Sequence, residues 1–335
     1  MTKSLDMYFY FSLFLSLCGC IVDREAYSNA KNLEKGIHIV SLNHLTIKNS
    51  IEDIINHPAF NGYGAHLLPW EDNSRYLTTT LRDVGSLMPY HDNVRPQVVV
   101  DALNFMVDMV NDRQTIFYDF YSEQEKKADP TKAHTGLFFF KGKPGAPFAV
   151  VCPGGGFTYV GSLHEGFPLA VQMNKRGYNI FVIKYRVNGG VATQDLAAAL
   201  TYIFEHAATF EVDKKNYSLW GGSAGARMVG DIVLSGVNRY GGKNLPTPSA
   251  AVIAYTGHST YSSDFPPTFL TVSADDHIAN VSVVERRADN LKKAGVKVEY
   301  RRYEHAGHGF GTGVGTDAEG WIDHAMDFWE RSMVN

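Results

Sequence analysis

Residues 216–225 read NYSLWGGSAG, and their pattern is the strongest indication of the fold in this sequence. Asn216–Trp220 is a short apolar run that predicts a buried strand, and Ala224–Val237 is a strongly apolar run that predicts a helix. Between them stands the pattern G-x-S-x-G at Gly221–Gly225. A strand that turns sharply into a helix lifts the central Ser223 side chain above the sheet edge, and small residues are needed where the backbone turns so tightly. The same pattern also fits a glycine-rich turn in which the serine only caps the helix.

The flanking sequence continues this alternation of apolar strand-length runs and amphipathic helix-length runs. The predicted strands are 115–121, 136–141, 148–152, 178–185, 216–220, 250–255, 268–273 and 297–303, and the predicted helices are 166–176, 194–210, 224–237, 281–294 and 318–331. Apolar strands separated by helices imply a mostly parallel sheet with helices on both faces. The predicted fold class is therefore α/β. In such sheets, ligands bind beyond the carboxyl ends of the strands.

Three more predicted strands end in residues that can do chemistry. Cys152–Phe157 (CPGGGF) carries three consecutive glycines, whose backbone N–H groups suit a developing oxyanion; a flexible loop or a phosphate-binding loop is the alternative. Ser273–Ile278 (SADDHI) offers carboxylates that can orient an imidazole or simply cap a helix. Glu304–Phe310 (EHAGHGF) offers His305 and His308, which also fit a surface loop or, with less support, a metal site.

In chain order these elements run glycine loop, serine, aspartate and histidine, each directly after a predicted strand. That order resembles the α/β-hydrolase superfamily. Pro153–Phe157, Leu163–Pro168 (LHEGFP) and the strand end Tyr185-Arg186 are similar to the acetyl esterase group. More narrowly, they resemble the bifunctional feruloyl and acetyl xylan esterase-like (BD-FAE-like) branch. The resemblance covers roughly residues 115–335.

The resemblance implies a serine esterase that works through an acyl-enzyme, with no cofactor and no metal. It assigns Ser223 as the nucleophile, His308 as the general base and Asp276 as the acid of the triad, with Asp275 as second choice. It also implies an oxyanion hole built from three backbone N–H groups, those of Gly155, Gly156 and Ala224.

The expected substrates are short-chain, acetyl-type esters, carried by a small molecule or a polysaccharide. Little sequence separates the predicted core strands, which argues against a large lid and against long-chain lipids as substrates. Two alternatives stay open. One is a serine peptidase or amidase of the same fold, and the other is a catalytically inactive surface binding protein.

The composition of the chain narrows the class further. The chain has 335 residues, of which 44% are hydrophobic and 20% charged, and its formal net charge is −4. These values are those of an ordinary globular protein, and they exclude a disordered or coiled-coil chain. No global basic field is available to bind nucleic acid, so no nucleic-acid partner is expected.

The N-terminus carries features of an export signal. Lys3 precedes the apolar run Met7–Leu17, and Leu17–Cys20 reads LCGC, which resembles a bacterial lipobox. The resemblance implies a signal peptide at 1–19 and a lipid anchor on Cys20. The protein would then be exported and held at a membrane surface, in the periplasm or at the cell surface. A plain cleaved signal with secretion, or a frayed apolar tail on a cytosolic protein, remains an alternative.

Residues 20–50 are expected to form a polar linker, 51–112 an N-terminal extension, and 113–335 the catalytic domain. Pro96 and the apolar positions that follow it predict one helix in the extension. The extension is a possible cap over the site. Its aromatic and polar side chains suit either sugar stacking or packing on the core, and they are Phe60, Tyr63, Trp70, Tyr76, Tyr90 and His91.

Overall fold

The computed structural model describes residues 41–333, and the residues from Leu42 onward form one compact unit. The predicted signal peptide at 1–19, the proposed lipid site at Cys20 and most of the predicted linker lie outside the described residues, so they stay predictions. Among the described residues, no helix combines the length and the apolar character needed to cross a bilayer.

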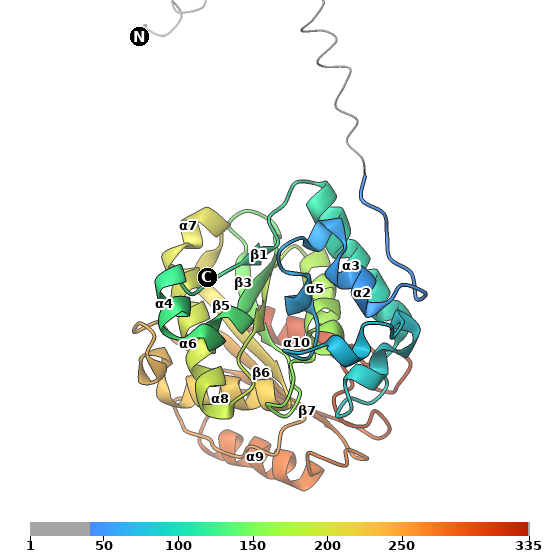
Figure 1. Cartoon of the computed structure of the whole chain (residues 1–335). Helices are drawn as coiled ribbons and strands as arrows, with labels where there is room; N and C mark the ends of the chain where they lie inside the picture. The colour runs from blue at the N-terminus through green and yellow to red at the C-terminus, as the bar shows by residue number, and fades with distance from the viewer. Residues whose placement is uncertain (1–40, 334–335) are drawn as a thin grey trace, which may run out of the picture. The chain divides into compact units, whose positions relative to one another are not determined.

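An eight-stranded sheet runs through this unit (Figure 1) in the order β1-β2-β4-β3-β5-β6-β7-β8. The strands β3 to β8 run parallel to one another. At the edge of the sheet, β2 pairs antiparallel with β4, and β1 pairs antiparallel with β2. The predicted mostly parallel sheet is therefore confirmed. The strands are β1 Phe117–Tyr118, β2 Gly136–Phe140, β3 Pro147–Cys152, β4 Asn179–Lys184, β5 Asp213–Gly222, β6 Ala250–Ala254, β7 Thr268–Ser273 and β8 Val298–Tyr303.

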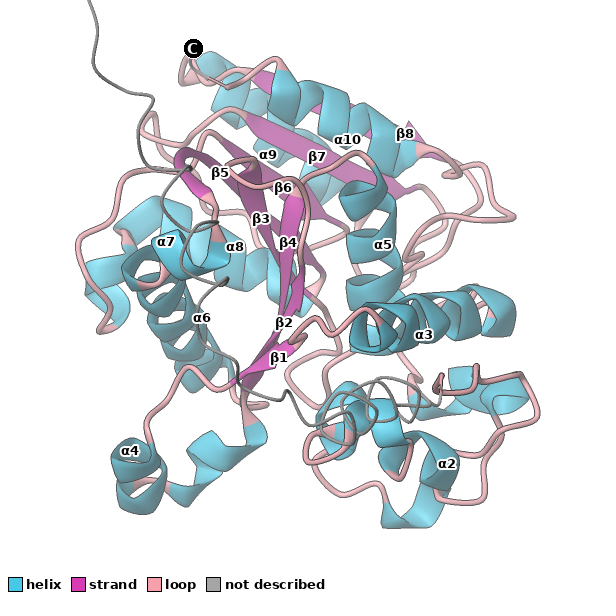
Figure 2. Cartoon of the chain, turned by 90° about the horizontal axis from the view of Figure 1, so that it is seen from above, coloured by secondary structure: helices cyan, strands magenta, loops and turns pink. Residues whose placement is uncertain are grey.

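Helices cover both faces of the sheet, as predicted. Figure 2 shows α6 and α8 on one face and α5 and α10 on the other, while α9 packs on β7 and β8. The central strands are buried along their whole length, because both faces of the sheet are covered, and most of their residues are apolar. The helices of this part are α5 Phe167–Lys175, α6 Gly189–Glu205, α7 Ala207–Phe210, α8 Ala224–Ser235, α9 Val281–Lys293 and α10 Trp321–Glu330.

The N-terminal extension is built from short turns around one long helix. The long helix, α3 Pro96–Asn111, packs against α5 (Figure 2). The N–H groups of Leu42 and Leu45 donate to the side chains of Asn111 and Asn104, at 2.9 and 2.7 Å. The packed part of the chain therefore begins before the predicted boundary at residue 51. The other elements are α2 Ile51–Ile55, the 3₁₀ turns Pro58–Phe60, Gly64–Leu67, Ser74–Tyr76 and Leu81–Leu87 and, between β1 and β2, α4 Glu123–Ala128 and the 3₁₀ turn Pro130–His134.

Two elements differ most clearly from their predicted bounds. The strand predicted at 115–121 is reduced to Phe117–Tyr118, because the chain turns away after two paired residues and the Tyr121 hydroxyl donates to buried Asp195 at 2.7 Å. The helix predicted at 194–210 begins earlier, where the Asn188 side chain caps it, and divides at His206, whose φ of −103° and ψ of 15° are not helical.

Candidate active site

Ser223 occupies a strained turn between β5 and α8. Its φ of +49° and ψ of −112° lie in a region that residues with a side chain rarely adopt. Its N–H donates to the Ala254 carbonyl at 3.0 Å, which helps to hold this conformation. A Cβ added at Gly225 would overlap the Cys152 carbonyl oxygen, so glycine is required there. The turn thus has the geometry that the G-x-S-x-G pattern predicts.

Ser223, His308 and Asp276 form a chain of hydrogen bonds. His308 Nε2 lies 2.9 Å from Ser223 Oγ, and His308 Nδ1 lies 2.8 Å from Asp276 Oδ2. The side chains of His308 and Asp276 are 2% and 0% exposed. Asp276 Oδ1 also accepts the backbone N–H groups of Ile278 and Ala279, at 2.8 and 2.6 Å, which fixes the carboxylate. A carboxylate can only accept from Nδ1, so Nε2 is left to accept the serine proton.

The alternative carboxylate, Asp275, points elsewhere. Its Oδ1 accepts hydrogen bonds from Ser273 Oγ at 2.5 Å and from the Gly307 N–H at 2.9 Å. Burial acts to raise the pKa of Asp275, but these hydrogen bonds outweigh it and lower the pKa. Its other oxygen lies 3.8 Å from the exposed ring of His305. The structure therefore joins Asp276, and not Asp275, to His308.

A pocket of about 380 Å³ opens beside Ser223. Gly156 and Ala224 line this pocket, whereas Gly155, the third predicted oxyanion donor, is not among its lining residues. The Ala224 N–H begins a helix and so has no acceptor inside that helix. Among the described residues, no acceptor is bonded to the Gly156 N–H. Two of the three residues predicted to supply donors thus line the pocket beside Ser223.

No residue of the extension is among those that line this pocket. All 12 lining residues fall between Gly156 and His308, and none belongs to 51–112. Of the six side chains considered for sugar stacking, five are buried or pack on neighbours: Phe60 is fully buried, Tyr63 stacks on Phe117, Trp70 donates to the Leu87 carbonyl, Tyr76 stacks on Trp70, and His91 is buried. The sixth, Tyr90, stacks on Tyr159 and is 40% exposed, so part of its ring faces solvent.

The extension instead holds the loop that carries His308. The Asp92 N–H donates to the His308 carbonyl at 2.8 Å, and Asp92 Oδ2 accepts the His308 N–H at 2.8 Å. Asn93 Nδ2 donates to the Ala306 carbonyl at 2.9 Å. These contacts were missed from the sequence, because they join residues more than 200 positions apart and no local pattern marks them.

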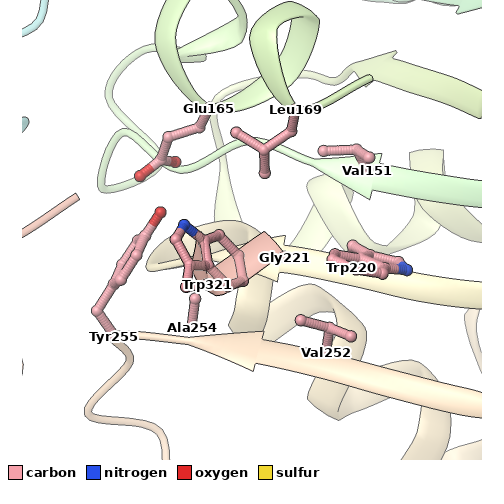
Figure 3. A pocket seen from close by; sticks show the side chains of 10 residues that line it. Val151, Glu165, Leu169, Trp220, Gly221, Val252, Ala254, Tyr255 and Trp321 are labelled. Atoms are coloured by element: carbon pink, nitrogen blue, oxygen red, sulfur yellow. The ribbon is translucent and has the colours of Figure 1, made fainter. Parts of the chain in front are cut away.

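Glu165 lies buried behind the glycine loop. It sits in a single π-helical turn, Ser162–Gly166, and its side chain is 1% exposed. Its Oε2 accepts the Gly154 N–H at 2.5 Å, and its Oε1 lies 3.2 Å from His91 Nε2. Figure 3 shows the Glu165 carboxylate and the Tyr255 hydroxyl pointing toward each other. Burial raises the pKa of Glu165, but His91 and the Gly154 N–H outweigh it and hold the pKa at about 2. A carboxylate therefore anchors the start of the glycine loop.

Cys152 is a free, buried thiol at the end of β3, and burial raises its pKa. Within residues 41–333, no group of three or more His, Cys, Asp or Glu side chains is arranged to hold a metal ion.

The chain has the fold of the α/β-hydrolases, as comparison with solved structures shows. An acetyl ester-xyloside bifunctional hydrolase from Caldicellulosiruptor lactoaceticus matches with a TM-score of 0.54 at 22% identity, over 64% of this chain and 95% of that one. Carboxyl esterase 2 from Tuber melanosporum matches with a TM-score of 0.51 at 18% identity, over 60% of this chain and 83% of that one. The predicted α/β-hydrolase fold is confirmed.

Within that class, residues 140–240 match the family model described as BD-FAE, which confirms the predicted resemblance to this branch. An acetylxylan esterase from Xylanibacter ruminicola is 26% identical over 93 residues, which are 27% of this chain and 19% of that protein. Endo-1,4-beta-xylanase B from Butyrivibrio fibrisolvens is 29% identical over 92 residues, which are 25% of this chain and 14% of that protein. The match covers less than a fifth of the length of either curated relative.

Proposed function

We propose that this chain is a serine esterase that removes short acyl groups, acetyl above all, from carbohydrate esters. The observation that carries the proposal is the hydrogen-bonded chain Ser223–His308–Asp276 at the carboxyl ends of the strands. The match to the BD-FAE family and the likeness to an acetylxylan esterase support a carbohydrate ester as the substrate.

The proposed reaction follows from this geometry. Ser223 Oγ attacks the ester carbonyl while His308 Nε2 takes its proton, and Asp276 stabilises the imidazolium that forms. The N–H groups of Gly156 and Ala224 donate to the oxyanion. His308 then gives the proton to the leaving alcohol, and water attacks the acyl-enzyme with the same base. The products are the free alcohol and the short carboxylic acid.

The size of the pocket supports small substrates. A volume of about 380 Å³ lies toward the lower end of the range for small-molecule sites, roughly 300–1,000 Å³. The pocket is open to solvent, and no residue of the extension lines it. An acetyl group on an accessible sugar fits such a site better than a long acyl chain does.

The decisive experiment compares acetyl release from acetylated xylan by the wild type and by Ser223→Ala. Removal of the nucleophile should lower kcat by about 10⁴-fold or more, with the fold unchanged. Exposed Ser282→Ala serves as the matched control and should keep full activity. A fluorophosphonate probe should label the wild type and Ser282→Ala but not Ser223→Ala.

Three results would contradict the proposal. Absence of Ser223-dependent labelling favours the inactive binding protein. Turnover of aminoacyl anilides without turnover of acetyl esters favours a peptidase or amidase. Turnover of p-nitrophenyl acetate without acetyl release from xylan would support an esterase but contradict a polysaccharide substrate.

A further inference from the structure

The pocket beside Ser223 also contains a cation. Arg227 lies one helical turn after Ser223 on α8, and its N–H donates to the Ser223 carbonyl at 3.2 Å. Its side chain lines the pocket and is 56% exposed. A group bound to Arg227 would therefore lie within the same pocket as the ester that Ser223 attacks.

Little in the protein neutralises this cation. No Asp or Glu is among the residues that line the pocket. Among the described residues, no hydrogen bond is made by the Arg227 guanidinium, and its nearest acid is Asp231, with Nε 4.0 Å from Oδ2. Arginine carries five donors in a planar fork, so its capacity to bind an anion is almost unused here.

Asp231 is already opposed by a second cation. Arg287 is 1% exposed, and its charge interacts with Asp231. Burial lowers the pKa of Arg287 to about 10, so it stays charged at neutral pH. His258 Nε2 also lies 3.4 Å from Asp231 Oδ1. Two arginines thus face one carboxylate, and a positive charge is left over at Arg227.

Arg287 also stiffens the wall on this side of the pocket. Its Nη1 donates to the His258 carbonyl at 2.8 Å, and the His258 ring accepts or donates a 2.6 Å hydrogen bond with Thr260 Oγ1. His258, Gly257 and Thr256 all line the pocket. Arg227 therefore lies in the same pocket as the loop 256–258, which Arg287 fixes through the His258 carbonyl. A fixed loop favours a defined binding geometry.

We propose that Arg227 is a carboxylate-binding subsite, so that the preferred esters carry a carboxylate close to the bond that is cleaved. The inference rests on the proposed esterase function and names its substrate class. The guanidinium fork pairs with a carboxylate through two parallel hydrogen bonds, which are stronger than neutral ones. The carboxylate can belong to the acyl part, as in a dicarboxylic half-ester, or to the sugar, as in an acetylated uronic acid.

The test uses two pairs of esters in which one member carries a carboxylate and the other a methyl group or a hydrogen in its place. Monomethyl succinate is compared with methyl butyrate for the acyl source, and an O-acetylated methyl glucuronide with the matching O-acetylated methyl xyloside for the sugar source. In at least one pair, the wild type should prefer the charged ester. Arg227→Gln should lower kcat/KM for that charged ester by about 10- to 100-fold, mostly through KM, and change the neutral ester less than about twofold.

Arg227→Lys keeps the charge without the planar fork and should retain part of the preference. Arg331→Gln is the matched control, because its side chain is 55% exposed and does not line the pocket. Added salt should weaken the preference of the wild type. The pair that shows the effect identifies the source of the carboxylate.

Two results overturn the subsite. One is no preference for the charged ester in either pair, and the other is an equal effect of Arg227→Gln on charged and neutral esters. Both are distinguishable from failure of the esterase itself. In that case the wild type would hydrolyse neither member of either pair, and Ser223→Ala would behave like the wild type.

Discussion

Glu165 joins two distant parts of the chain through one carboxylate. It accepts the Gly154 N–H from the glycine loop and lies 3.2 Å from His91 of the extension, with its side chain 1% exposed. Loss of one partner of a buried polar pair leaves the other without compensation, which costs roughly 1–3 kcal/mol. We therefore expect Glu165→Gln, which keeps the shape and removes the charge, to lower the free energy of unfolding by about 2 kcal/mol in urea titrations.

A double-mutant cycle checks that the loss comes from this pair. His91→Gln combined with Glu165→Gln should cost at least about 1 kcal/mol less than the sum of the single changes. Glu123→Gln, at an 80% exposed side chain, should have almost no effect. Additive losses in the cycle would mean that Glu165 and His91 act independently.

At the residue scale, the sequence predicted those side chains that follow strands. Ser223, Asp276 and His308 each come directly after an apolar run, and the structure brings them within hydrogen-bonding distance. Glu165 lies in the motif Leu163–Pro168, which resembles the family. Its contact with His91 could not be predicted from that motif, because the motif does not contain His91. No sequence pattern indicated the proposed role of Arg227, because that role depends on the absence of acidic residues from the pocket lining.

At the scale of elements, the segment 90–93 governs the position of the His308 loop. Asp92 holds His308 by two backbone-directed hydrogen bonds, both of 2.8 Å. Asp92→Ala removes the one that its side chain accepts. We expect kcat on p-nitrophenyl acetate to fall by about tenfold with KM within about twofold, because a displaced base impairs proton transfer rather than binding.

Asp92→Asn keeps an acceptor oxygen and should restore most of the lost kcat. Exposed Asp101→Ala, on the surface of α3, is the control and should match the wild type. If kcat and the melting temperature of Asp92→Ala both stay at wild-type values, the segment does not position His308. A fall in melting temperature with unchanged kcat would indicate a purely structural contact.

The elements themselves were predictable to different degrees. β4 lies inside the predicted strand 178–185, because a strand buried on both faces reads as a continuous apolar run. β1 is an edge strand of two residues, and its predicted length was wrong. The β-propensity of side chains does not indicate where a strand stops pairing with its neighbour. The 3₁₀ turns of the extension are too short for any periodicity, and tertiary contacts decide them.

At the scale of the whole molecule, a buried histidine links stability to pH. His164 is fully buried, and its Nε2 donates to the Gly309 carbonyl at 2.9 Å. Burial lowers its pKa to about 4, from 6.5 for an exposed histidine. The unfolded chain therefore takes up a proton first as the pH falls. Between about pH 6.5 and pH 4 this histidine should remove about 3 kcal/mol from the free energy of unfolding.

His164→Gln keeps a donor for the Gly309 carbonyl but does not titrate. Urea titrations at pH 7 and pH 4 should show a smaller loss for this variant than for the wild type, by about 3 kcal/mol. His324→Gln, at an exposed position on α10, should lose as much as the wild type. Equal losses in all three proteins would show that His164 is not the group responsible.

The hold of Asp92 on His308 limits how this protein can be divided. The stretch matched by the BD-FAE family model, 140–240, contains Ser223 but neither Asp92 nor His308. A fragment starting at residue 113 would retain the whole sheet, yet it would leave behind both bonds that steady the base. A chimera made by joining this α/β-hydrolase-fold core to a foreign N-terminal module would keep Ser223, the proposed nucleophile, but leave His308 without these two hydrogen bonds. We therefore expect the proposed reaction to require residues 42–112 together with the core.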